Sequence, residues 1–475
     1  MRDRKTAPSH RCLIPIVSWL VPLAAVAAPL AAAEEGPHKE PVVYVSLSET
    51  ARQVTIRSDG AFRVGRWGTH LPPTRVPAGE SWSFAAESGG IVIADGQGHS
   101  RGAFSERIFV FPEAPKGVLS LDGARYRGEI ILSPLGSKMR VINALGLEDY
   151  LKGVLPAEIG RLKEDGLAAL KAQAVAARSY TLYQMVARPL GEFDLWPDVA
   201  DQVYQGFDGE DPLCDEAVDA TRGIVALYKG RIIRANYSST CGGRAASASA
   251  VWPDETSLPY LRAREDRRGG ADFCAKAPHY RWEEDWDCGE LYDVVRKNLW
   301  RGVAELEGKD PGTVTRMKIL DRTPSGRVGR LAVWTDSGRY VVRGDKVRWV
   351  LRRTGGGPLR SAYLGALKQE TRDGRCRLVL RGAGYGHGVG MCQTGAIEMS
   401  RQGYDFTEIL GHYYSGVTLA KIYNGERAQT PSAQEQRLPG AERGTLIGAL
   451  RRDAKAVPIF EIGMSGELDS PRSRW

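Results

Sequence analysis

The sequence has no long apolar run beyond residue 33, no strong net charge and no closely paired cysteines. Each absence argues against a feature: a transmembrane segment, a nucleic-acid partner or a structural zinc site. Because no later run is long enough to span a bilayer, we expect no transmembrane segment once residues 1–33 are removed. The formal charge is +8 over 475 residues, and residues 1–33 supply +3 of it from four basic residues and one aspartate. The remaining +5 is too small and too scattered to predict a nucleic-acid partner.

Cysteines are few, and none of the six that follow residue 33 belongs to a C-x-x-C pair. They are Cys214, Cys241, Cys274, Cys288, Cys376 and Cys392. Without such pairs, a structural zinc site is the less favoured interpretation. An even count permits three disulfides in an oxidising compartment, with fifteen possible connectivities. For Cys241 we predict a disulfide, because nothing nearby in the sequence supplies the base that a cysteine nucleophile needs.

Residues 1–33 have the organisation of a secretory signal. Four basic residues precede an apolar run from Cys12 to Ala33, which ends in three alanines before Glu34. A basic start, an apolar middle and a small-residue end are typical of a cleaved signal. The alternative is an uncleaved anchor helix, but three prolines interrupt the run. We therefore predict an exported protein of the periplasm or cell-wall space, or one secreted from the cell.

The rest of the chain divides into three parts, and the expected fold class is α+β. Residues 41–143 contain short runs of β-branched and aromatic residues between turn formers, which predicts a strand-rich N-terminal unit. Residues 144–423 predict a mixed α/β core with one long alanine-rich helix, from about Leu162 to Val186. Further helices are predicted at 289–304 and Phe406–Tyr414, further strands at 315–320, 328–335 and 339–343, and strands and turns over 200–262. Residues 424–475 are polar, which predicts a disordered tail.

The first candidate for chemistry is Glu158, which precedes the alanine-rich helix. The pattern predicts a helix over Leu147–Val154 that is broken at Pro156, so Glu158 would lie between two helical pieces. Its neighbours Ala157 and Ile159 are apolar, and an isolated carboxyl group in apolar surroundings has a raised pKa. A glutamic acid still protonated near neutral pH can donate a proton to a glycosidic oxygen. The alternative is a carboxylate at a helix end or in an ion pair.

The second candidate is the segment from Tyr237 to Arg244, where small hydroxyl residues stand beside two glycines. This composition is typical of a loop that presents backbone donors to a ligand. The predicted binding residues are Tyr237, Ser238, Ser239, Gly242 and Gly243. Downstream, Trp252 and Tyr260 would stack on sugar rings. The alternative is an ordinary turn with aromatic residues in the core.

The third candidate runs from Gly382 to Gln393, where five glycines alternate with other residues. In an extended strand these glycines share one bare face, while Tyr385 and His387 project from the other, so a polymer can approach closely. The spacing is not that of a nucleotide phosphate loop. We predict Tyr385, His387 and Gln393 as binding residues; the alternative for His387 is a structural histidine.

Together and in this order, the three segments resemble the SpoIID/LytB family (stage II sporulation protein D and relatives). The resemblance covers residues 41 to 423, and its motifs are the segment around Glu158 and G-x-G-H-G-V-G-M-x-Q from Gly384 to Gln393. Its best-understood member is a lytic transglycosylase that cuts peptidoglycan strands, preferring those stripped of stem peptides. The resemblance implies that Glu158 is catalytic. Some members bind zinc through His and Cys before a Gln-x-Tyr, but the corresponding loop here, Arg188–Tyr204, has neither, so no metal or other cofactor is expected.

The resemblance also implies a mechanism and partners. Glu158 would protonate the oxygen between N-acetylmuramic acid and N-acetylglucosamine, then take the proton of the 6-hydroxyl, leaving a 1,6-anhydro end. The partners would be glycan strands and an amidase that removes stem peptides. The main alternative, suggested by LytB-type relatives, is a non-catalytic wall-binding activator of an N-acetylmuramoyl-L-alanine amidase. A purely structural wall module is the third interpretation.

Overall fold

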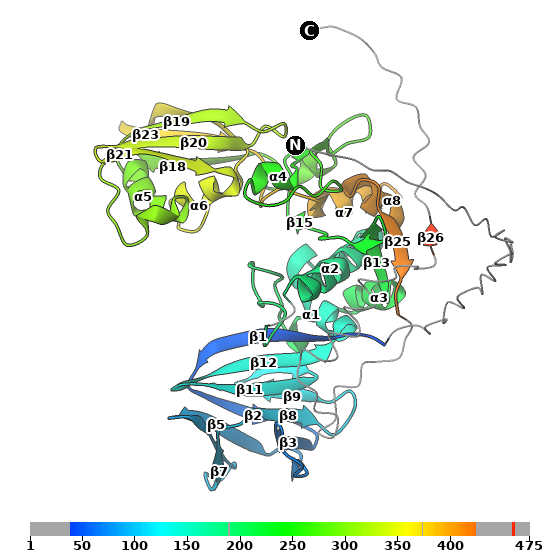
Figure 1. Cartoon of the computed structure of the whole chain (residues 1–475). Helices are drawn as coiled ribbons and strands as arrows, with labels where there is room; N and C mark the ends of the chain where they lie inside the picture. Colours follow the sequence, from blue (N-terminus) through cyan, green and yellow to red (C-terminus); the bar gives the residue numbers. More distant parts are fainter. Residues whose placement is uncertain (1–38, 189–190, 373, 424–457, 461–475) are drawn as a thin grey trace, which may run out of the picture. The chain divides into compact units, whose positions relative to one another are not determined.

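The computed structural model describes residues 39–188, 191–372, 374–423 and 458–460 (Figure 1). Within these ranges the chain has an α+β fold with a strand-rich N-terminal region, as predicted. The predicted signal and the predicted tail lie outside the described residues, except for Pro458–Phe460, which forms a strand. No helix in the described ranges is long and apolar enough to cross a membrane.

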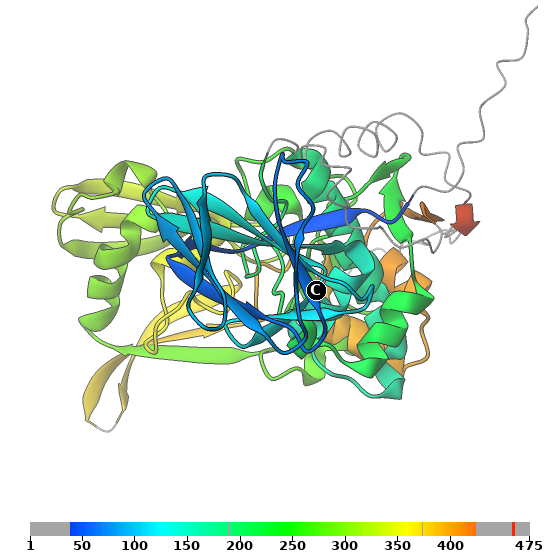
Figure 2. The same ribbon diagram turned by 90° about the horizontal axis from the view of Figure 1, so that it is seen from below.

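The N-terminal region consists of two six-stranded antiparallel sheets, seen from a second direction in Figure 2. One sheet has the order β1-β12-β11-β8-β3-β4 and the other β10-β9-β2-β5-β6-β7. The strands are β1 (Val42–Ala51), β2 (Gln53–Arg57), β3 (Phe62–Arg66), β4 (Thr74–Val76), β5 (Ser81–Glu87), β6 (Gly90–Ala94), β7 (Ser100–Phe104), β8 (Ile108–Pro112), β9 (Val118–Leu121), β10 (Ala124–Arg127), β11 (Glu129–Leu135) and β12 (Lys138–Gly146). Alternate residues such as Val54 and Ile56 are buried, as strand geometry requires, and they share a hydrophobic core with Phe84.

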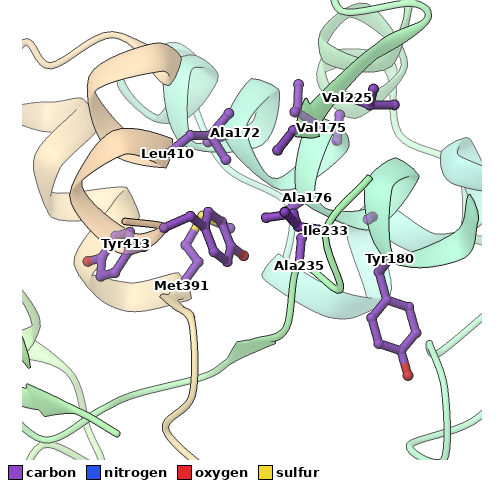
Figure 3. Close-up of a cluster of buried hydrophobic side chains, with 14 of the residues drawn as sticks. Ala172, Val175, Ala176, Tyr180, Val225, Ile233, Ala235, Met391, Leu410 and Tyr413 are labelled. Atoms are coloured by element: carbon purple, nitrogen blue, oxygen red, sulfur yellow. The ribbon is translucent and has the colours of Figure 1, made fainter. Parts of the chain in front are cut away.

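The helical elements that follow include one long buried helix, against which four other α-helices pack. They are α1 (Leu147–Ile159), η1 (Glu164–Gly166), α2 (Leu167–Ala187), η2 (Phe207–Gly209), α3 (Pro212–Ala220), α4 (Ala248–Val251), η3 (Phe273–Lys276), α7 (Gln393–Arg401) and α8 (Phe406–Tyr413). The alanines of α2 let its neighbours approach closely. Figure 3 shows Ala172 and Ala176 facing Leu410, Met391 and Ile233, which come from later segments of the chain. The predicted alanine-rich helix is confirmed, although it begins five residues later than predicted.

Short strands complete this part of the chain. They are β13 (Ile224–Tyr228), β14 (Arg231–Ile232), β15 (Tyr237–Ser238), β16 (Arg244–Ala245), β17 (Arg264–Glu265), β24 (Met391–Cys392), β25 (Thr418–Lys421) and β26 (Pro458–Phe460). The pairing of β15 with β24 is parallel, with Tyr237 opposite Met391 and Ser238 opposite Cys392. This pairing brings the second and third candidate segments together.

Residues 282–382 have a hydrophobic cluster of their own, around Trp286, Val333 and Val350. The elements are β18 (Trp282–Asp287), α5 (Glu290–Asn298), η4 (Leu299–Arg301), η5 (Ala304–Leu306), β19 (Val314–Arg322), β20 (Val328–Thr335), β21 (Gly338–Arg343), η6 (Gly344–Lys346), α6 (Val347–Val350), β22 (Leu364–Arg372) and β23 (Arg375–Gly382). A disulfide joins Cys288 to Cys376, across two antiparallel strands. The three strands predicted between 315 and 343 are confirmed. The helix predicted at 289–304 is confirmed only as far as Asn298, where the 3-10 turns η4 and η5 take over.

Three predictions about local structure are wrong. Residues 200–262 do not consist of strands and turns alone, because helices α3 and α4 lie within them. Helix α1 does not stop before Pro156 but continues to Ile159, so Glu158 lies in its last turn rather than between two helices. A proline removes one amide donor, and here the helix ends three residues later, where Gly160 donates to the Pro156 carbonyl.

The glycine segment is not an extended strand with one bare face. Four of its five glycines have positive φ values: 83° at Gly384, 97° at Gly386, 76° at Gly388 and 72° at Gly390. Each turns the chain against a neighbouring segment. A β-carbon on Gly390 would lie 1.9 Å from the carbonyl oxygen of Asn236, so only glycine fits there. The alternation therefore serves close packing against residues 236–241 and Arg327.

Candidate functional site

Glu158 lies at the C-terminal end of α1 with its side chain half-buried. Burial raises the pKa of its carboxyl group to about 7, and two hydrogen bonds, from the Val203 amide and the Gln393 side chain, limit the increase. The Val203 amide lies 2.7 Å from Oε1. Within the described ranges Glu158 forms no ion pair, so burial dominates, as its apolar sequence neighbours predicted.

The residue before Val203, Gln202, organises the tyrosines beside Glu158. Its Nε2 donates to the hydroxyl of Tyr237 at 2.9 Å, and its Oε1 accepts from Tyr150 at 3.1 Å and from Thr181 at 2.7 Å. The charge of Glu158 contributes to the raised pKa values of both tyrosines, after the larger effect of burial. Gln202 was not predicted as a site residue, although the Gln-x-Tyr pattern that contains it was visible in the sequence.

Gln393 connects Glu158 to the glycine segment and to α2. Its Nε2 lies 3.4 Å from Oε1 of Gln173, which is fully buried in α2. Gln393 also forms the hydrogen bond that limits the pKa of Glu158. The end of the third candidate segment therefore contacts the first candidate residue. Gln173 could not be distinguished in the sequence from the other residues of the alanine-rich helix.

His387 is connected to the surroundings of Glu158 by a hydrogen bond to the backbone of Tyr237. Its ring packs against Trp252 with centroids 5.1 Å apart, and Nδ1 accepts a hydrogen bond of 3.0 Å from the Val389 amide. Burial lowers the pKa of His387 to about 4, and a hydrogen bond to the Tyr237 backbone opposes this shift. His387 is therefore neutral near pH 7, with its proton on Nε2 because Nδ1 is an acceptor. Tyr385 lies two residues away and stacks on His279 with centroids 4.8 Å apart.

The Tyr237–Gly243 segment is more deeply buried than a ligand-presenting loop requires. Tyr237 and Ser239 keep partial exposure, whereas Ser238, Gly242 and Gly243 are buried. A β-carbon on Gly242 would lie 2.9 Å from Ala383, and one on Gly243 would lie 2.0 Å from the Asp272 carboxylate. Both glycines therefore permit close packing inside the protein. Of the two downstream aromatics, Tyr260 is buried and Trp252 is half-buried.

The loop Arg188–Tyr204, in which the resemblance led us to expect no zinc, is held in place by contacts among its own residues. Asp201 accepts hydrogen bonds from the Trp196 amide at 2.9 Å and from Arg188 at 2.8 Å. Trp196 packs edge-on against Phe193 with centroids 4.7 Å apart. These contacts fix the loop between α2 and Gln202. The Gln202 side chain then donates to Tyr237, and the Val203 amide donates to Glu158.

Cys241 is not in a disulfide, and the prediction of one is wrong. Its Sγ lies 3.7 Å from Sγ of Cys274, whereas a disulfide requires about 2.05 Å. Among the described cysteines the one disulfide is Cys288–Cys376. The sequence had favoured no pairing, and these two residues stand opposite each other only because β18 and β23 pair.

The fold and this site define a protein with two N-terminal β-sheets and a half-buried glutamic acid at the end of the helix before an alanine-rich core helix. Residues 136–228 match the model of the Stage II sporulation protein family, SpoIID, and residues 270–390 match a Domain of unknown function (DUF8618). The chain belongs to the SpoIID family.

Individual relatives agree with this assignment. An uncharacterised protein of Brachyspira hyodysenteriae is 33% identical over 311 residues, which are 63% of this chain and 73% of that protein. The stage II sporulation protein D of Bacillus amyloliquefaciens is 29% identical over 59% of this chain and 76% of its own length. The amidase enhancer of Bacillus subtilis is 29% identical over 63% of this chain, but the match spans only 45% of that protein.

Proposed function

We propose that the chain is an exported lytic transglycosylase that cleaves the glycan strands of peptidoglycan, with Glu158 as general acid and base. The observation that carries this proposal is the half-buried Glu158 carboxyl group, whose pKa is raised to about 7. A carboxyl group with a pKa near the working pH can both donate and accept a proton within one reaction cycle. Membership of the SpoIID family supports the cell wall as the place of action.

The reaction needs one carboxyl group, because the nucleophile belongs to the substrate. Protonated Glu158 donates its proton to the oxygen between N-acetylmuramic acid and N-acetylglucosamine, and the bond from that oxygen to the anomeric carbon breaks. The 6-hydroxyl of the same muramic acid then bonds to the anomeric carbon and gives its proton to ionised Glu158. The acid is regenerated and no water is consumed. This differs from the paired carboxylates of most glycosidases.

The surrounding residues have two proposed roles. Tyr237, Ser239, Tyr385 and His387 are partly exposed, and we assign them to contacts with the strand. Ser238, Gly242, Gly243 and Gln393 are buried, and we assign them to shaping the site. The Val203 amide keeps Oε1 in place in both charge states, because a neutral or ionised carboxyl oxygen can accept its hydrogen bond.

The direct test incubates purified protein with glycan strands freed of stem peptides and searches for 1,6-anhydro ends by mass spectrometry. Wild type should produce them, and Glu158→Gln should lower the rate by at least about a hundredfold, since general acid catalysis contributes that much. Glu164→Gln, which neutralises an exposed carboxylate in the next element, is the matched control and should retain activity. Fragments that persist undiminished in Glu158→Gln would remove Glu158 from the mechanism.

The second candidate function is activation of an amidase without cleavage, favoured by similarity to a protein named amidase enhancer. The same preparation tests it. If wild type leaves the strands intact but raises the rate at which an N-acetylmuramoyl-L-alanine amidase releases stem peptides, the chain is an activator.

A further inference from the structure

A second group of chemically reactive side chains is separate from the residues assigned to glycan cleavage. It consists of Cys241 after β15, Asp266 after β17, Cys274 in η3 and Cys392 in β24. Each of the four is at most 1% exposed. One sulfur or carboxylate oxygen from each lies within 4.8 Å of all the others, so three thiols and a carboxyl group converge on one point.

Two distances between ligand atoms fit a tetrahedral ion between the four groups. Zinc–sulfur bonds of about 2.3 Å at tetrahedral angles place two sulfurs about 3.8 Å apart, and Cys241 Sγ lies 3.7 Å from Cys274 Sγ. A zinc–oxygen bond of about 2.0 Å places oxygen about 3.5 Å from sulfur, and Oδ2 of Asp266 lies 3.2 Å from Cys241 Sγ.

The ligand atoms are also oriented by their neighbours, as in known metal sites. The Tyr413 hydroxyl donates to Oδ1 of Asp266 at 2.7 Å, which leaves Oδ2 toward the sulfurs. The Cys241 amide donates to Cys392 Sγ at 3.2 Å. An amide donor of this kind stabilises the negative charge of a thiolate. A metal site needs such thiolates, whereas a disulfide contains none.

Two buried polar groups, His412 and Arg327, lie beside the cluster. His412 is 3% exposed, its Nε2 has no hydrogen-bond partner within the described residues, and that atom lies 3.9 Å from Asp266 Oδ1. The guanidinium of Arg327 is 2% exposed and donates to the carbonyls of Cys241 and Arg244, with no carboxylate partner in the described part of the chain. A zinc ion with four anionic ligands carries net negative charge, which would compensate this buried cation.

We propose that Cys241, Cys274, Cys392 and Asp266 bind one zinc ion in a closed structural site. Three thiolates and a carboxylate complete the tetrahedron and leave no position for water or substrate, so the ion stabilises the fold rather than reacting. The sequence disfavoured zinc because no C-x-x-C pair is present; here the ligands come from four separated segments. Cys392 directly precedes Gln393, so the ion also anchors the backbone beside Glu158.

The test measures the metal content of the purified chain by mass spectrometry and counts its free thiols with and without a chelator. We expect one zinc per chain and three additional reactive thiols after chelation. Co²⁺ added to the stripped protein should give the visible absorption of a tetrahedral thiolate site. Chelation should also lower the thermal midpoint, because the metal binds only the folded chain.

A pair of variants separates this site from general loss of a buried thiol. Cys274→Ser should bind Co²⁺ at least tenfold more weakly, whereas Cys214→Ser, which alters a buried free cysteine outside the cluster, should bind it like wild type. If Cys274→Ser does not fold, the metal content and the Co²⁺ spectrum of wild type still show whether the zinc site exists. A Cys241–Cys274 disulfide in the native protein, or wild type without stoichiometric zinc and without a Co²⁺ spectrum, would overturn the proposal. Glycan cleavage is tested separately, by the anhydro-end assay on wild type and Glu158→Gln.

Discussion

Glu148 and Glu158 belong to the same helix, yet one is held ionised and the other has a pKa near neutrality. Burial by itself would raise the pKa of Glu148, but Arg178 reverses the effect with hydrogen bonds of 2.9 and 2.6 Å, and the pKa is lowered. Within the part of the chain that the structure describes, Glu158 has no such cation, so burial raises its pKa to about 7. Helix α1 therefore carries one structural carboxylate and one candidate acid.

Glu148→Ala should destabilise the protein severely. Arg178 is fully buried and would lose its charged partner, which costs about 3–5 kcal/mol. Urea unfolding followed by circular dichroism measures the loss. The exposed Glu164→Ala should change the free energy of unfolding by less than about 0.5 kcal/mol. Equal losses in the two variants would mean that the buried ion pair is not important for stability.

Glu158→Gln should be more stable than wild type at pH 8 but not at pH 4. The pKa of Glu158 rises from 4.5 to about 7 on folding, so the unfolded chain loses this proton first. Wild type therefore loses stability as the pH rises from about 4.5 to 7, by roughly 2–3 kcal/mol, and glutamine removes this dependence. Thermal unfolding at both pH values measures the difference. A variant that is less stable at pH 8 by the same amount as at pH 4 would contradict the raised pKa.

Replacing Gln393 should move the pH profile of glycan cleavage. Its hydrogen bond favours ionised Glu158, so Gln393→Leu should raise the pKa of Glu158 further. The proton donor would then persist to higher pH, and the alkaline decline in cleavage rate should begin at higher pH than in wild type. Gln402→Leu, at an exposed position beyond α7, is the control and should keep the wild-type profile. A shift to lower pH would show that Gln393 does not donate to the carboxylate.

Gly390→Ala should destabilise the protein far more than Gly403→Ala. Both glycines have positive φ, so both variants bear the strain of about 1–2 kcal/mol that a β-carbon meets there. At position 390 the β-carbon would also lie 1.9 Å from the Asn236 carbonyl, whereas at position 403 no described residue lies within 4 Å. Urea unfolding should therefore show an additional loss of about 1–3 kcal/mol for Gly390→Ala. Equal losses would mean that the glycine segment is not tightly packed.

Local patterns predicted much of the fold because they reflect local causes. The runs of β-branched and aromatic residues that predicted the strand-rich N-terminal unit lie within β1, β2, β6, β8, β11 and β12. Shorter or more polar strands such as β4 and β7 were missed, because only pairing with a neighbour forms them. Helix α3 was missed despite a visible signal: Asp211 caps it and Pro212 follows at the first helical position.

The sequence by itself determined the strand-rich start, the alanine-rich helix, the family resemblance and the apolar surroundings of Glu158, because residues close in the chain carry all of these. Only the tertiary structure decided that Val203 and Gln393 hold Glu158, that Cys288 pairs with Cys376, and that Cys241, Cys274, Cys392 and Asp266 converge. These contacts join segments tens to hundreds of residues apart, and no periodicity records which distant segments folding brings together.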